Sequence, residues 1–156
     1  MPLTPEQKVE PIIAIINVLS EFVTKTMLQI TIAVGNLNQR TDRKDYPDRA
    51  DFNTLKEAIA AKVDTKLLIP LDRYKKQIET NNDSYPLPVY REIMAIIELE
   101  ENKWKQMQTE ILALSLKQAA RYQRKLYRLR SQQLSHLDKK IKPGLEAEMD
   151  KIREGS

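Results

Sequence analysis

The feature that most constrains this chain is the stretch over residues 88–142, which contains no glycine and, after Pro88, no proline. Nothing in this stretch interrupts a helix, and one continuous helix would extend about 80 Å at about 1.5 Å per residue. Every other segment meets a proline or a polar loop within about 30 residues. The sequence therefore predicts one long helix over about residues 88–142, against which shorter helices pack.

Charge is distributed unevenly along this stretch. Residues 89–116 carry three basic and five acidic side chains, whereas residues 117–142 carry nine basic side chains and one acidic one, Asp138. The formal net charge of the whole chain is only +4, so the rest of the chain offsets much of this local charge. The predicted long helix therefore has an acidic first half and a strongly basic second half.

The composition is typical of a charge-rich helical protein, with 41% hydrophobic residues, 31% charged residues and only three glycines. Cysteine is absent and His136 is the single histidine, which excludes disulfides, zinc fingers and other sites that need two Cys or His ligands. The sequence contains no glycine-rich phosphate loop and no recognisable nucleophile–base pair. We therefore expect a non-enzymatic protein with no cofactor, no metal and no small-molecule substrate.

The first third of the chain predicts a central helix of a bundle. Thr4, Pro5 and Gln7 fit a helix start with a capping box. Apolar residues then recur at steps of three and four between positions 9 and 37, and further apolar residues widen that surface. A polar loop is expected over residues 35–48, where the apolar period stops.

A membrane-spanning role for residues 11–34 is not expected, because Glu21 and Lys25 would lie in the middle of the span. The N-terminus lacks the basic region and small-residue cleavage site of a signal peptide. We therefore expect a cytoplasmic protein without a membrane span.

A second helical region is expected from about residue 48 to residue 80, with Pro70 kinking or dividing it. A loop with two prolines follows and leads into the long stretch. The predicted fold is all-α: an antiparallel bundle of three long helices over residues 1–143, with an extended C-terminal helix. Pro143 is expected to end that helix and leave residues 144–156 as a short tail. The apolar stripes fall out of register near residues 114–119, so a bend there, giving a fourth bundle helix, is the alternative.

The basic half of the long helix is the strongest functional signal. Several of its cations lie three or four residues apart and so share a face, and two tyrosines interleave with them. The candidate binding residues are Lys117, Arg121, Tyr122, Arg124, Lys125, Tyr127, Arg128 and Arg130. Three interpretations are open: a solvated or intramolecularly paired face, antiparallel pairing of two long helices through their opposite charges, and binding of nucleic acid or another polyanion.

The segment from Arg130 to His136 resembles the motif of HEPN ribonucleases, an arginine followed after four to six residues by a histidine. That resemblance implies an all-helical fold and a composite RNA-cleaving site in which Arg130 and His136 of two subunits are catalytic. The family usually has Asn, Asp or His directly after the arginine, where this chain has Ser131. An exposed or capping role for His136 is the competing interpretation.

Two further features have structural interpretations. Glu98, Glu100 and Glu101 are expected to form an exposed acidic face, because the Glu-x-x-His pairs of di-iron bundles are missing. Trp104 continues the apolar stripe of its helix and is expected in the core.

The leading functional hypothesis is a helical interaction or assembly module that self-associates through the long helix into a homo-oligomer or pairs with another helical protein. The alternatives are a nucleic-acid-associated subunit, binding the phosphate backbone through residues 117–142, and a HEPN-like ribonuclease.

Overall fold

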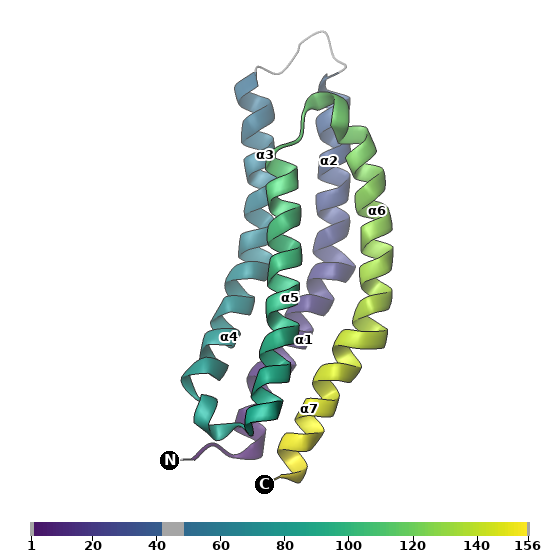
Figure 1. Ribbon diagram of the computed structural model, residues 1–156. Coiled ribbons are helices and arrows are strands. Elements are labelled where there is room, and N and C mark those ends of the chain that lie inside the picture. The colour runs from purple at the N-terminus through teal and green to yellow at the C-terminus, as the bar shows by residue number, and fades with distance from the viewer. Residues whose placement is uncertain (1, 42–48, 156) are drawn as a thin grey trace.

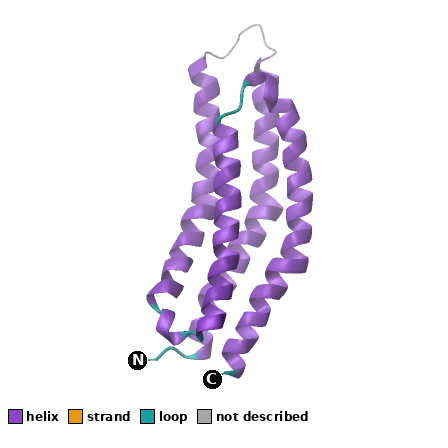
Figure 2. Cartoon of the chain, in the orientation of Figure 1, coloured by secondary structure: helices purple, strands orange, loops and turns teal. Residues whose placement is uncertain are grey.

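The structure is a computed structural model that describes residues 2–41 and 49–155, the side chains of residues 38–41 and 49–51 excepted. The described residues form four long helices and contain no strand (Figures 1 and 2). The first comprises α1 (Pro5–Glu21), the π-helical turn η1 (Phe22–Thr26) and α2 (Met27–Thr41). The second comprises α3 (Arg49–Val63), the π-helical turn η2 (Asp64–Leu68) and α4 (Ile69–Thr80). The third is α5 (Leu87–Leu112), and the fourth comprises α6 (Ala119–His136), the π-helical turn η5 (Leu137–Ile141) and α7 (Lys142–Glu154).

The four helices run alternately up and down, so the N- and C-termini lie at the same end of the bundle (Figure 1). The first long helix contacts both the second and the fourth, through α2 with α3 and α6, and through α1 with α4 and α7. Helix α5 packs against α3, α4 and α7. The predicted all-α antiparallel bundle is confirmed, in its four-helix form.

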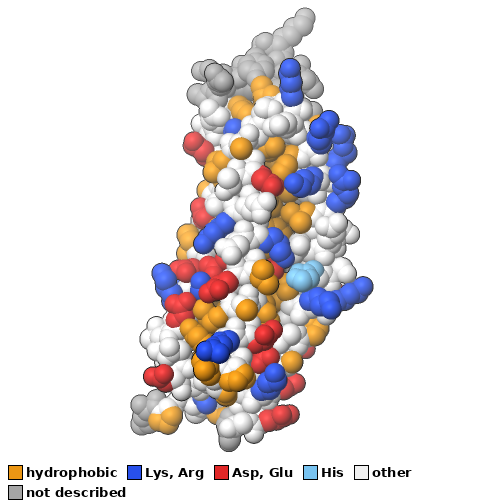
Figure 3. Space-filling model, viewed as in Figure 1, with side chains coloured by type: hydrophobic (Ala, Val, Ile, Leu, Met, Phe, Trp, Pro, Cys, Tyr) orange, Lys and Arg blue, Asp and Glu red, His pale blue; other side chains and the backbone are white. Residues whose placement is uncertain are grey.

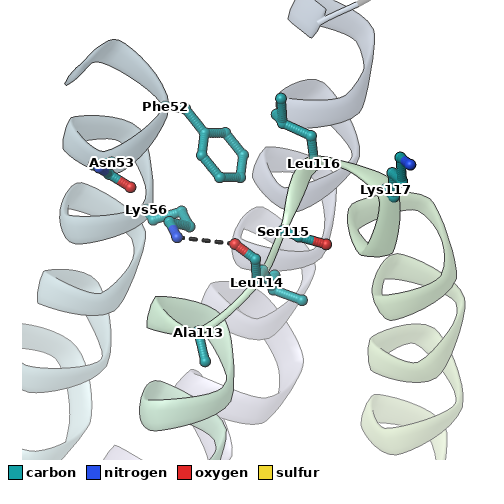
Figure 4. Close-up of a pocket in the computed structure, with 8 residues that line it drawn as sticks. All are labelled: Phe52, Asn53, Lys56, Ala113, Leu114, Ser115, Leu116 and Lys117. Carbon is teal, nitrogen blue, oxygen red and sulfur yellow. Dashed lines mark hydrogen bonds between the residues drawn. The ribbon is translucent and has the colours of Figure 1, made fainter. Parts of the chain in front are cut away.

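The predicted continuous helix over residues 88–142 is wrong, because α5 ends at Leu112 and α6 runs back along the bundle. The side chain of Lys56, on α3, donates to the carbonyl oxygen of Leu112 at 3.0 Å and to that of Leu114 at 2.9 Å, and Figure 4 shows the second of these bonds. A positive charge at a helix C-terminus binds the carbonyls that have no partner within the helix. Ser115 and Gln118 then form a capping box that starts the short 3₁₀ turn η4 (Leu116–Gln118). The loss of register between the two apolar stripes therefore marks a bend.

The expected short tail after Pro143 is also wrong, because the helix continues as α7 to Glu154. Pro143 lies in the first turn of α7, directly after η5. A proline ring clashes with the carbonyl four residues earlier in a regular α-helix, and the wider π-helical turn gives that carbonyl room. Pro70 follows η2 in the same way, which is how it divides the second long helix. The buried side chains of Leu145, Met149 and Ile152 attach α7 to the bundle.

The predicted loop from residue 35 is wrong in its first part, since α2 continues through Thr41, and its remainder, residues 42–48, lies outside the described residues. Gly35 lies against the side chain of Gln123 on α6, where a Cβ atom would overlap the Gln123 amide. Gln123 also donates to the carbonyl of Thr31 at 3.2 Å. Glycine therefore serves here for close approach of α2 and α6 rather than for a turn.

The core lies along the first long helix, as the apolar pattern predicts. Trp104 is fully buried and meets Phe22 edge-to-face, with 5.0 Å between ring centroids. At the start of α1, the predicted capping box of Thr4 and Gln7 is confirmed.

The acidic residues of α5 differ from expectation. Glu100 and Glu101 are only 3% and 5% exposed, so the expected exposed acidic face is wrong for these two. Glu101 pairs with Lys75 of α4 at 2.9 Å, and Glu100 pairs with Lys103 at 2.6 Å. A buried carboxylate is stable when it is paired in this way. The carboxylates of α5 are therefore largely engaged within the chain.

The segment Pro5–Leu37 is long and apolar enough to cross a membrane by length and composition, and 44% of its most apolar window is buried inside the bundle.

Candidate binding surface

Four of the candidate residues form a single line of positive charge on α6 and the turn before it. Lys117, Arg121, Arg124 and Arg128 follow one another at steps of four, three and four, and all four are exposed. Side chains at these steps lie on one side of a helix, and eleven residues of helix extend about 16 Å. We call these four residues the basic stripe. Figure 3 shows basic side chains gathered along the α6 edge of the molecule.

The basic stripe has no acidic partner within the part of the chain that the structure describes. Helix α6 contains no aspartate or glutamate, so no partner is available one turn away. Several lysines elsewhere are paired, as Lys75 is with Glu101 at 2.9 Å and Lys151 with Glu148 at 3.1 Å. Pairing at three or four residues along a helix is common where both charges occur. Among the described residues, the basic stripe therefore presents positive charge to solvent without an ion pair.

Two further candidates, Tyr122 and Lys125, are engaged with Glu110 of α5. The Tyr122 hydroxyl donates to Glu110 Oε2 at 2.8 Å, and Lys125 Nζ lies 3.7 Å from the same oxygen. Lys125 Nζ also lies 5.7 Å from the centroid of the Tyr122 ring. Burial, reinforced by the Glu110 carboxylate, raises the pKa of Tyr122 well above its usual value, so its hydroxyl remains a donor. These contacts join α6 to α5 close to the turn between the two helices.

Helices α5 and α6 enclose a groove with a volume of 460 Å³, which we call the α5–α6 groove. Buried Leu114 and Tyr122 supply apolar surface inside it, and Figure 3 shows apolar side chains between the two helices. Lys103 of α5 donates to Gln133 Oε1 of α6 at 2.8 Å, so the two helices are bridged further down the bundle. The groove is lined by Glu110, Ala113, Leu114, Gln118, Arg121, Tyr122, Lys125 and Arg128.

The last two candidate residues, Tyr127 and Arg130, have different environments. Tyr127 is 45% exposed, whereas Arg130 is half-buried and turned toward the first long helix. Arg130 Nε donates to the carbonyl of Val23 at 3.2 Å, and its terminal nitrogen donates to the carbonyl of Thr24 at 2.7 Å. Both carbonyls belong to η1, where the shift from α- to π-type bonding leaves a carbonyl without its usual partner. The structure therefore gives Arg130 a structural role.

His136, the other residue of the HEPN-like motif, is exposed at the end of α6. Because the Arg130 guanidinium is engaged with η1, the motif lacks a free arginine beside its histidine.

A second cavity, of 590 Å³, lies between the start of α3 and the α5–α6 turn (Figure 4). Phe52 and Lys56 border it on one side and residues 113–117 on the other. Lys56 Nζ lies 4.7 Å from the centroid of the Phe52 ring and is used in capping α5. The ammonium group of Lys56 is therefore engaged in the turn, whereas Lys117 of the basic stripe also lines this cavity.

Sequence reasoning missed Glu110 and Lys56. Glu110 lies 12 residues before Tyr122, and only a turn between them brings the two together. Lys56 lies 56 residues before the carbonyl of Leu112. Neither contact has a signal in local spacing. No group of three or more His, Cys, Asp or Glu residues suited to a metal ion occurs among the described residues.

No family model, no curated protein and no solved structure matches this chain. The described residues therefore define an all-α four-helix bundle in which the basic stripe has no acidic partner among them and adjoins the α5–α6 groove.

Proposed function

We propose that this protein is a non-enzymatic subunit that binds the phosphate backbone of nucleic acid through the basic stripe on α6. The observation that carries the proposal is the lack of any acidic partner for Lys117, Arg121, Arg124 and Arg128 among the described residues. Cations that neutralise phosphates release counterions, and this release supplies sequence-independent affinity. The stripe's four exposed cations on one side of a helix suit contact with successive phosphates.

The stripe proposal is tested with the double variant Arg124→Gln, Arg128→Gln. We expect binding of a labelled single-stranded oligonucleotide, measured by fluorescence anisotropy, to weaken about tenfold or more at low salt. The slope of log affinity against log salt should become shallower by about 1.4, since about 0.7 is lost for each phosphate contact on single strands.

The matched control is the double variant Lys139→Gln, Lys140→Gln, which removes the same charge from exposed positions of η5 outside the stripe. Its affinity should fall much less than that of the stripe variant. Equal losses of affinity in the two variants would show that binding depends on net charge alone and not on the position of the basic stripe. An absence of binding by the unaltered protein at low salt would reject the proposed function.

Self-association is the second candidate. Leu28 and Ile32, one helical turn apart on α2, are 37% and 46% exposed, which gives an apolar surface for a second copy of the chain. The sequence suggested antiparallel pairing of two continuous long helices. That arrangement is no longer supported, because α5 and α6 are separate helices and most carboxylates of α5 pair with lysines of the same chain.

A further inference from the structure

We propose that the α5–α6 groove binds one unpaired base of a single strand, and that Glu110 accepts a hydrogen bond from the exocyclic amino group of that base. The inference rests on the proposed function, because it assigns a place to the base beside a phosphate backbone held by the basic stripe. It adds a substrate class, single-stranded nucleic acid, and a preference among bases.

The groove and the basic stripe are parts of one surface. Arg121 and Arg128 belong to the stripe and also line the groove. A strand whose phosphates contact these two arginines therefore has its bases next to the groove opening. Bases of a duplex are stacked and paired inside the helix, whereas those of a single strand are free to enter a pocket.

The interior of the groove suits a flat, partly apolar group. Its volume of 460 Å³ falls within the range of about 300–1,000 Å³ typical of small-ligand pockets. Leu114 and Tyr122 line the groove with 6% and 8% of their surface exposed, so a base contacts a small apolar area there and not an open ring face.

Among the residues that the structure describes, Glu110 is the only carboxylate that lines the groove. It weakens phosphate binding by repulsion, but it is held in place by the Tyr122 hydroxyl and Lys125, which both meet Oε2. Its other oxygen, Oε1, accepts no hydrogen bond from the described residues. An ionised carboxylate only accepts hydrogen bonds, so it matches the exocyclic amino group of cytosine, adenine or guanine. In uracil and thymine the ring N3–H donor lies between two carbonyl oxygens, which repel a carboxylate.

The test compares oligocytidine with oligouridine of equal length, about 12 nucleotides, within the site sizes of single-strand binders. The two bases differ at position 4, where cytosine has an amino group and uracil a carbonyl oxygen, and at the neighbouring N3, which accepts in cytosine and donates in uracil. We expect the unaltered protein to bind oligocytidine about fivefold more tightly, which is the effect of about one hydrogen bond. Fluorescence anisotropy at fixed salt gives the ratio of the two affinities.

Glu110→Gln should raise the affinity for both strands by removing a negative charge, and should abolish the preference for cytidine. The ratio, unlike the affinity, is independent of this change in net charge. Tyr122→Phe keeps the ring but releases Glu110, so it should reduce the ratio and leave most of the affinity. Helical content by circular dichroism checks that each variant is folded.

The outcomes separate this inference from the proposed function. Binding without a preference for cytidine, or a preference that persists in the Glu110→Gln variant, overturns the proposed base pocket. Neither result contradicts phosphate binding by the basic stripe. Equal affinity for a duplex of the same length overturns the single-strand assignment. An absence of binding to any oligonucleotide overturns the proposed function itself.

Discussion

Lys56 is the side chain on which the turn between α5 and α6 depends. It is 8% exposed, and its ammonium group donates to the carbonyls of Leu112 and Leu114 while lying over the Phe52 ring. A buried ammonium is costly unless its donors are satisfied. These contacts satisfy two of its three donors and stabilise the last carbonyls of α5, so a single residue of α3 fixes the point where the chain reverses.

We expect Lys56→Met to lower the free energy of unfolding by about 2 kcal/mol. Methionine keeps the apolar stem, so the loss reports the charge-assisted hydrogen bonds and the helix-end interaction. Urea denaturation followed by circular dichroism gives the value. Lys62→Met, at an exposed position of the same helix, is the control and should change stability by less than about 0.5 kcal/mol. Similar losses in both variants would show that Lys56 does not hold the turn.

At the scale of the element, the three π-helical turns explain how long helices accommodate features that would otherwise break them. Two of them, η2 and η5, precede prolines within a first helical turn. The third, η1, has no proline after it, and instead its carbonyls receive the hydrogen bonds of Arg130. The π-helical turn in the first long helix is therefore stabilised from the fourth.

Arg130→Met should destabilise the protein by about 1–2 kcal/mol, because two carbonyls of η1 lose a charged donor that is partly screened by solvent. Urea denaturation measures this loss. Arg128→Met, two residues away and exposed, should leave stability within about 0.5 kcal/mol of the unaltered protein. If the Arg130→Met variant is as stable as the Arg128→Met control but has lost an RNA-cleaving activity, the result supports the HEPN interpretation and contradicts a structural role for Arg130.

The sequence could predict those elements whose cause is local. The capping box at Thr4, the burial of Trp104 and the line of cations on α6 all follow from spacings within a few turns of helix. The end of α5 could not be predicted from proline or glycine, since residues 89–142 contain neither. A local signal did exist in Ser115 and Gln118, but the capping of α5 comes from Lys56, which is distant in sequence.

The same contrast between local and distant causes explains why only part of the candidate surface could be predicted. The basic stripe depends only on helical periodicity, whereas the roles of Lys125, Tyr122 and Arg130 depend on partners in other helices. The groove exists only because α6 folds back beside α5. An interpretation with one continuous helix therefore could not predict a site formed between α5 and α6.

At the scale of the whole molecule, the folding back of α6 changes which forces are available for self-association. Glu98 and Glu101 pair with Lys75, Glu100 with Lys103, and Glu110 with Lys125, so the carboxylates that were expected to attract a second copy are largely used within one chain. Leu28 and Ile32 remain partly exposed on the outer side of the first long helix. If the protein self-associates, an apolar contact there is therefore favoured over charge pairing.

We expect light scattering to give the mass of a dimer or larger species that is the same at low and at high salt, because burial of apolar side chains is not screened by ions. The double variant Leu28→Gln, Ile32→Gln should then return the protein to a monomer. Leu99→Gln, at a more exposed position on α5, is the control and should leave the mass unchanged. Dissociation at high salt would place the interface on charged groups, such as the basic stripe, and so set self-association in competition with phosphate binding. A monomer under both conditions would reject self-association and leave the basic stripe free for nucleic acid.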